Sequence, residues 1–263
     1  MKKITLLAPL FVMALTSCGS TRVTNEWEEI SKEELLEIVS NYDADFVPDT
    51  YKITNNIEMT INVVVEGNGE KATTNATTKQ NSELGYDIST EGDYYLYQNS
   101  VSEVDSNDES IAQERQEAYE YIKANGEGTY DYYVKNADET EASLVSSGDF
   151  NLSFVVQIAN QYRLTSSMVE AFDSYGATFK VNDDGIVTVN VGMPLEIDVV
   201  GAPATLDIVG QFDENGYTIY QGLENGSYEF SNESEMDGVT VSTTCKVSME
   251  SQGFVGQDLA RPY

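Results

Sequence analysis

The residue types of this chain exclude several kinds of catalytic chemistry. Its 263 residues contain no histidine, which excludes Ser-His-Asp and Cys-His catalysis, histidine-based zinc sites and an imidazole that shuttles protons near neutral pH. The 45 Asp and Glu residues could supply a pair of catalytic carboxylates, as in glycosidases, but such a pair is defined by its separation in space. We therefore predict no catalytic residue and no cofactor, and a carboxylate-dependent hydrolase is the least favoured function.

Carboxylates spaced along a loop could instead bind calcium. Asp105, Asn107 and Glu109 present oxygen ligands at alternate positions. However, Ser110 stands where an EF-hand loop needs glycine, and Gln116 stands where it needs a bidentate glutamate. We predict no metal site.

Tyrosine is unusually frequent in one part of the chain and could form a contact surface for a ligand or a partner. Amphipathic aromatic rings are typical of recognition surfaces, but tyrosine is also a good strand residue. Adjacent residues of a strand point to opposite faces, which favours the purely structural interpretation. The candidate contact residues are Tyr94, Tyr95, Tyr97, Tyr130, Tyr132 and Tyr133.

The charge of the chain excludes one class of partner. The formal net charge is −31 at pH 7. A surface of this sign repels nucleic acid and anionic lipid headgroups, so we predict no nucleic-acid partner. The simplest role of the charge is solubility.

The N-terminus has the order of regions found in signal peptides. Lys2 and Lys3 form a positive region, residues 4–15 form an apolar region too short to span a bilayer, and small residues then lead to Cys18. Cys245 is the second of the two cysteines, so a chain whose Cys18 is modified has no internal disulfide.

The sequence Leu15-Thr16-Ser17-Cys18 resembles the lipobox of bacterial lipoproteins. The resemblance implies a diacylglyceryl thioether on Cys18, cleavage before this residue and acylation of the new amino terminus. Two or more acyl chains anchor a protein stably, so the resemblance also implies attachment to the cell membrane or cell envelope on its extracytoplasmic face. The alternative is a plain secretory signal with an unmodified cysteine.

Hydrophobic periodicity predicts three helical segments behind this signal. Ser31 and Glu34 form a capping box that opens the first helix. Ile111, Ala118, Tyr119 and Ile122 fit one face of a second helix that ends at Asn125-Gly126. Residues 152–162 and 167–175 fit a broken helix, with Ser167 and Glu170 as its second capping box.

Alternation of apolar and polar residues predicts the strands. The longest alternating runs are 51–66, 70–80, 187–199 and 238–250. The third run alone would make a strand far longer than usual. Cys245 falls in an apolar row of the last run, so we expect a buried, unreactive thiol.

Together these patterns predict a mainly β protein with minor α content. We expect a large curved antiparallel sheet or half-barrel with two or three helical segments on its concave face. The expected organisation is a signal peptide at 1–17, a lipidated tether at 18–30, a single extracytoplasmic domain at 31–253 and a C-terminal tail at 254–263.

The order of these elements is similar to that of half-barrel lipid-carrier lipoproteins. The resemblance implies a non-catalytic lipoprotein that binds or carries an apolar ligand on its concave face. A cell-surface interaction or structural lipoprotein that contacts an envelope protein is the alternative. Alternation alone leaves open whether the concave face is an open cavity or a packed core.

Overall fold

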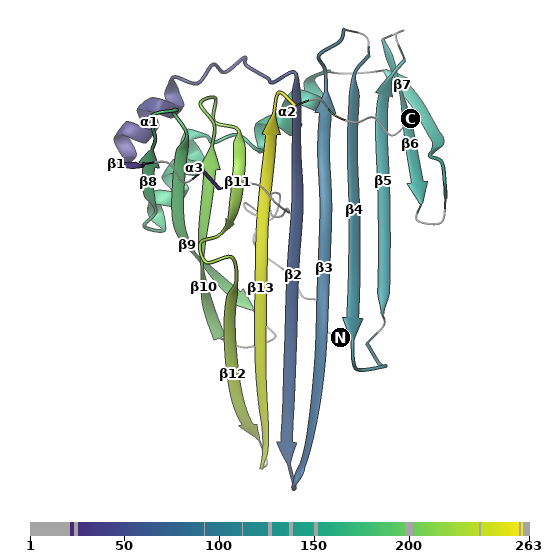
Figure 1. Cartoon of the computed structure of the whole chain (residues 1–263), viewed down its shortest axis with the longest axis vertical. Helices are drawn as coiled ribbons and strands as arrows, with labels where there is room; N and C mark the ends of the chain where they lie inside the picture. Colours follow the sequence, from purple (N-terminus) through teal and green to yellow (C-terminus); the bar gives the residue numbers. More distant parts are fainter. Residues whose placement is uncertain are drawn as a thin grey trace.

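One antiparallel sheet and three helices make up the described part of the chain (Figure 1). The computed structural model describes residues 22–23, 26–91, 93–111, 113–125, 128–136, 139–149, 152–197, 202–236, 238–257 and 259. The strands are β1 (Glu28–Ile30), β2 (Thr50–Gly67), β3 (Glu70–Asp87), β4 (Tyr95–Ser106), β5 (Glu114–Ala124), β6 (Thr129–Asn136), β7 (Ser143–Asp149), β8 (Thr178–Val181), β9 (Val187–Ile197), β10 (Ala202–Phe212), β11 (Thr218–Leu223), β12 (Tyr228–Met236) and β13 (Val239–Val255). The helices are α1 (Lys32–Ser40), α2 (Leu152–Gln161) and α3 (Ser166–Ser174).

The predicted fold class is therefore confirmed. The strand order is β1-β8-β9-β10-β11-β13-β2-β3-β4-β5-β6-β7, and β12 also pairs with β13. Strands β2 to β7 form a meander of neighbours in sequence, whereas β13 returns to the middle of the sheet and pairs with β2.

Three strands in the centre are very long. β2 and β3 have 18 residues each and β13 has 17. At about 3.3 Å per residue they run for roughly 60 Å. The turn between β2 and β3 places Asn68 at φ 55° and Gly69 at φ 82°, which is the conformation that asparagine and glycine favour in a two-residue hairpin.

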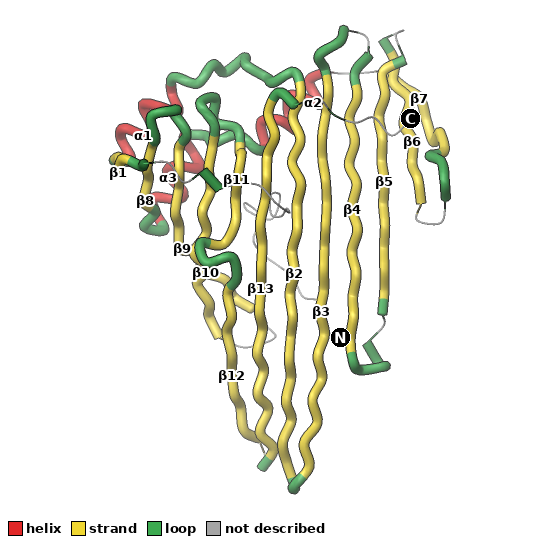
Figure 2. The backbone as a smooth tube through the Cα atoms, viewed as in Figure 1, coloured by secondary structure: helices red, strands yellow, loops and turns green. Residues whose placement is uncertain are grey.

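The two faces of this sheet differ in what covers them. Because side chains alternate along a strand, Tyr51 and Ile53 lie on one face, which we call face A, and Lys52 and Thr54 lie on the other, face B. Figure 2 shows the helices gathered at one end of the sheet, the end where β2 begins. They pack on face A, so the expected placement of helices on a single face is confirmed.

Two packed clusters join the helices to this face. Leu35 of α1 and Phe172 of α3 pack with Val187, Val189 and Ile208 of β9 and β10. In the second cluster, side chains of α2 pack on the first residues of β2 and the last residues of β3, and Val155, Ala159, Tyr51, Ile53 and Tyr86 are all almost fully buried. The core therefore lies beneath the helices, at one end of the long strands.

The start of α1 agrees with the sequence pattern, but the start of α3 does not. Ser31 and Glu34 form the predicted capping box. In α3 the N-cap is Thr165, whose side chain accepts a hydrogen bond from the Met168 backbone at 3.3 Å. The predicted capping box of Ser167 and Glu170 is wrong, because Ser167 already lies in the first turn of the helix.

The helix predicted at residues 111–125 is also wrong. This segment contains strand β5, which pairs with β4 and β6 on its two sides. The apolar residues happened to fall at helical spacing, but Tyr119 and Tyr121 also alternate with Glu120 and Ile122. Pairing with two neighbouring strands decides between the two patterns, as often happens for short or mixed segments.

Candidate functional site

Below the packed clusters, face A presents apolar side chains that no described helix covers. We call this region the open apolar surface. Among the described residues, none of its members belongs to the two packed clusters or to a third, smaller cluster of Tyr95, Tyr97 and Tyr121. It comprises the half-buried Ile57, Met59, Ile61 and Val63 of β2, Val241 of β13 and Phe230 of β12, with the buried Cys245 and Val247 of β13 among them.

Strand register makes this surface continuous. Cys245 lies opposite both Ile61 of β2 and Phe230 of β12. On the other side of β2, Ile61 pairs with Ala76 and Val63 with Thr74. Because the side chains of β3 are small, the surface is shallower there than beside the larger side chains of β2. No described helix packs into this depression.

The chemistry of the two faces is opposite along the same strands. From Asn55 to Val65, β2 and the facing parts of β3, β12 and β13 place no charged side chain on face A. Face B carries cross-strand ion pairs there, such as Lys79 with Glu58 at 3.3 Å and Lys71 with Glu66. Face A in this half of the sheet is therefore suited to apolar groups.

Cys245 lies in an apolar row of β13 and is buried, as its sequence pattern predicted. Its side chain is 1% exposed, and burial raises the pKa of its thiol. A buried thiol with a raised pKa is a poor nucleophile, so Cys245 fits a packing role.

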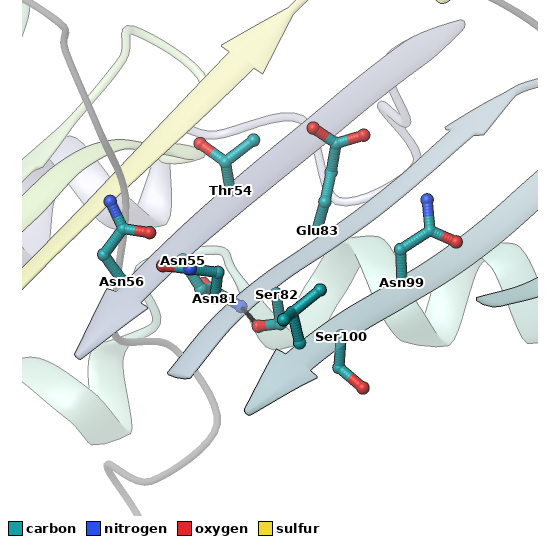
Figure 3. A pocket seen from close by; sticks show the side chains of 9 residues that line it. Thr54, Asn55, Asn56, Asn81, Ser82, Glu83, Asn99 and Ser100 are labelled. Atoms are coloured by element: carbon teal, nitrogen blue, oxygen red, sulfur yellow. Dashed lines mark hydrogen bonds between the residues drawn. The ribbon is translucent and has the colours of Figure 1, made fainter. Parts of the chain in front are cut away.

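A polar depression of about 370 Å³ lies beside the junction between core and open surface (Figure 3). Its walls are two rows of face B side chains from β2, β3 and β4. Figure 3 shows that the side chains of Thr54, Glu83 and Asn99, which form one of these rows, point to the same side of the sheet. Its lining residues are Thr54, Asn55, Asn56, Asn81, Ser82, Glu83, Asn99, Ser100 and Val101. Amide, hydroxyl and carboxylate groups dominate this lining, so it does not suit an apolar ligand.

The row of side chains between these two walls points to face A, the opposite face of the sheet. Asn55 and Ser82 lie on face A, where the Asn55 amide donates a hydrogen bond to the Ser82 hydroxyl at 2.5 Å. This polar pair separates the packed core from the open apolar surface.

The candidate contact tyrosines do not form one patch. Tyr95, Tyr97 and Tyr133 lie on face B, whereas Tyr130 and Tyr132 lie on face A, and Tyr94 precedes β4. Tyr95 and Tyr97 stack with ring centroids 5.3 Å apart.

The face B tyrosines are largely covered. Tyr95 is 2% exposed and Tyr97 5% exposed, and Leu259 from the C-terminal tail packs against their cluster. Burial raises the pKa of Tyr97, and a hydrogen bond to Glu83 raises it further. These rings act as a second, small core on face B.

The lipobox-like residues Leu15, Thr16, Ser17 and Cys18 lie outside the described residues. Within the described ranges, no helix has the length and apolar character needed to cross a membrane. The same part of the chain contains no cluster of three or more Cys, Asp or Glu side chains that could hold a metal ion.

Comparison with known proteins identifies no family. No protein-family model matches the chain, and no curated protein matches it in sequence. Among solved structures, a DUF1329 family protein from Desulfovibrio piger overlaps with a TM-score of 0.20 and 10% identity over 87% of this chain and 94% of that chain.

Two further solved structures overlap to a similar extent. The InvG secretin domain β-barrel from the Salmonella SPI-1 injectisome gives a TM-score of 0.24 and 10% identity over 83% of this chain and 66% of that chain. The translocator domain of the autotransporter NalP from Neisseria meningitidis gives 0.15 and 8% identity over 84% and 94%. Overlaps this weak carry no argument about function, which must come from the surface itself.

Proposed function

We propose that the protein is a lipid-anchored extracytoplasmic lipoprotein that binds an acyl chain or a similar apolar ligand on the open apolar surface. The Leu15-Thr16-Ser17-Cys18 motif supports the anchor and the location in the cell envelope. The open apolar surface supports the ligand class. No residue is assigned a catalytic role.

The observation that carries the proposal is an apolar half of face A that no described helix covers. Soluble proteins rarely leave large contiguous apolar areas uncovered, and those areas mark binding sites for apolar groups. Aliphatic side chains without charges match an acyl chain, whereas protein contact surfaces are usually richer in aromatic residues and arginine with a polar rim. A contact through the six tyrosines has less support, because both faces share them and Tyr95 and Tyr97 are buried.

Two adjacent valines of β2 provide a matched test. Val63 and Val64 are both half-buried, but Val63 lies on face A and Val64 on face B. Val63→Asn should weaken binding of a fluorescent palmitate analogue by about tenfold, since it replaces apolar contact worth about one to two methylene groups. Val64→Asn should leave binding unchanged, although both variants place a polar residue in the same strand.

The measurement is a fluorescence titration of each variant, together with native mass spectrometry of lipid carried through purification. Equal affinities for the two variants, or a wild-type chain that binds no palmitate analogue and carries no lipid, would contradict the proposed ligand site.

The anchor has its own test. Cells that express the full chain should incorporate radiolabelled fatty acid into the protein, and Cys18→Ser should abolish the label and release the chain from the membrane fraction. A fully labelled Cys18→Ser chain would contradict the assignment of Cys18 as the lipidated residue.

A further inference from the structure

A buried glutamine of β10 holds the backbone of the N-terminal segment. Gln211 is 1% exposed, and its side chain lies on face B opposite Thr188. Its amide oxygen accepts a hydrogen bond from the Val23 backbone N–H at 3.0 Å. Its amide nitrogen donates to the Val23 carbonyl at 3.1 Å and to the Thr188 hydroxyl at 3.2 Å.

A second contact fixes the neighbouring residue. The Arg22 guanidinium lies against both carboxylate oxygens of Glu224, at 2.9 and 3.1 Å. Both contacts come from one guanidinium nitrogen, Nη2, while Nη1 lies 3.5 Å from the Glu224 backbone carbonyl, so side chain and backbone of Glu224 both hold Arg22. Arg22 and Val23 are therefore held by a side chain at β10 and a side chain just after β11.

This arrangement has the character of a binding site for backbone. A buried amide costs free energy unless its donor and acceptor groups are satisfied, and in Gln211 the Val23 backbone satisfies one of each. Gln211 contacts the backbone N–H and carbonyl of Val23, so the contact does not depend on the side chain of residue 23. The buried amide of Gln211 therefore holds the backbone of the N-terminal segment at Val23.

We infer that Gln211 and Glu224 form a docking site for the segment that follows the lipidated cysteine, and that this site turns face B toward the anchoring membrane. The inference rests on the proposed lipid anchor at Cys18. Cys18 precedes Arg22 by four residues, which span at most about 14 Å when fully extended. The lipid is thus held close to the part of face B formed by β10 and β11.

The short segment between Cys18 and Arg22 excludes the orientation in which face A is turned toward the membrane. To reach the far side of the molecule around the nearest edge, the chain would pass β9, β8 and β1, which are spaced about 4.8 Å apart. That path alone takes about 14 Å. The layer of α1 and α3 on face A adds roughly 10 Å more, the diameter of a helix with its side chains. The open apolar surface therefore faces away from the membrane that holds the anchor, and its ligand must arrive from the aqueous side.

Hydrogen exchange tests the docking itself. In the mature full chain, exchange of the backbone amide of Val23 should be about fivefold or more slower than in an unstructured peptide of residues 18–27. An Arg22→Ala/Val23→Pro variant removes the docking contacts for the orientation test below. Both changes lie in the docked segment, so the domain keeps its own core. Glu26→Ala, at an exposed residue of the same segment, is the matched control and should keep the protection. Equal exchange of the Val23 amide in the wild-type chain and in the peptide would overturn the docking site.

Membrane proximity tests the orientation. Single fluorophores at Thr205, exposed on face B of β10, and at Ser167, exposed on α3, are compared in a Cys245→Ala background of the lipidated chain bound to phosphatidylcholine vesicles. A headgroup-attached quencher should quench the Thr205 probe several-fold more than the Ser167 probe. The double variant should lose this difference, whereas Glu26→Ala should keep it.

The outcomes separate the two proposals. Equal quenching at the two positions in the wild type, or an unchanged difference in the double variant, would overturn the orientation. A chain that fails to bind vesicles and incorporates no fatty acid would contradict the lipid anchor, while the hydrogen-exchange result would still decide the docking site.

Discussion

At the scale of single residues, a buried arginine joins three parts of the chain. Arg163, between α2 and α3, is 7% exposed. Its guanidinium donates to the backbone carbonyls of Asn215 and Asp43, both at 2.8 Å, and lies over the rings of Tyr42 and Tyr217. Desolvation of this charge is offset by charge-assisted hydrogen bonds and by the two rings.

We expect Arg163→Gln to lower the free energy of unfolding by about 2–4 kcal/mol, because buried carbonyls lose a charged donor. Urea denaturation measures the change. Arg115→Gln is the matched control: Arg115 pairs with Glu103 and Glu117 but its side chain is 58% exposed, and exposed pairs contribute about 1 kcal/mol or less. Similar losses for the two variants would contradict a special role for Arg163.

A second prediction concerns Cys245. Because burial raises the pKa of its thiol, the folded chain resists ionisation, and stability from this group is lost as pH rises from the ordinary thiol pKa through the raised one. Alkylation by iodoacetamide in neutral buffer should be about tenfold slower, or more, in the folded chain than in urea. Mass spectrometry of the alkylated chain measures both rates. Rates within twofold of each other would show an accessible thiol and contradict the burial of Cys245.

At the scale of elements, the capping box of α1 can be tested directly. Ser31→Ala removes the acceptor for the Glu34 backbone N–H at 3.2 Å and should reduce stability by about 1 kcal/mol. Ser40→Ala, at the other end of the same helix, serves as the control because its hydroxyl only donates to a carbonyl of the last turn. Urea denaturation curves that coincide for wild type and Ser31→Ala would contradict the cap.

Periodicity predicted most elements but not every type or boundary. The long strands and α1 were predictable because their patterns extend over many residues or include a specific cap. β5 was not, because its sparse apolar residues fit both a helix and a strand, and only its partners β4 and β6 decide. Glu28–Ile30, expected within the tether, pairs with β8 through contacts that no local pattern shows.

The apolar character of the open apolar surface could be predicted from the sequence, but its boundaries could not. The apolar row of β2 and the small residues of β3 are visible in the sequence. Which part of that row the helices cover depends on where α2 packs, and this is a long-range contact. The docking of Val23 by Gln211 joins residues 188 positions apart, so spacing could not reveal it.

At the scale of the whole molecule, excess negative charge opposes the compact state. The formal net charge of −31 creates repulsion that salt screens. Raising sodium chloride from about 10 mM to about 500 mM, which shortens the Debye length from about 30 Å to a few Å, should raise Tm by several degrees. Differential scanning calorimetry measures this, with an equal osmolality of sucrose as the uncharged control. A lower Tm at high salt would show that the surface ion pairs outweigh the repulsion.

The position of β13 has a consequence for how the protein acquires its structure. β13 is the last of the described strands, yet it lies between β11 and β2 and is the only described strand that pairs with both halves of the sheet. During synthesis, the meander from β2 to β7 can form as local hairpins, but the two halves cannot join until residues 239–255 have emerged. Until then the inner edge of β2 stays unpaired, so we expect assembly to finish only once β13 has been synthesised, with chaperones or proteases competing for the incomplete sheet.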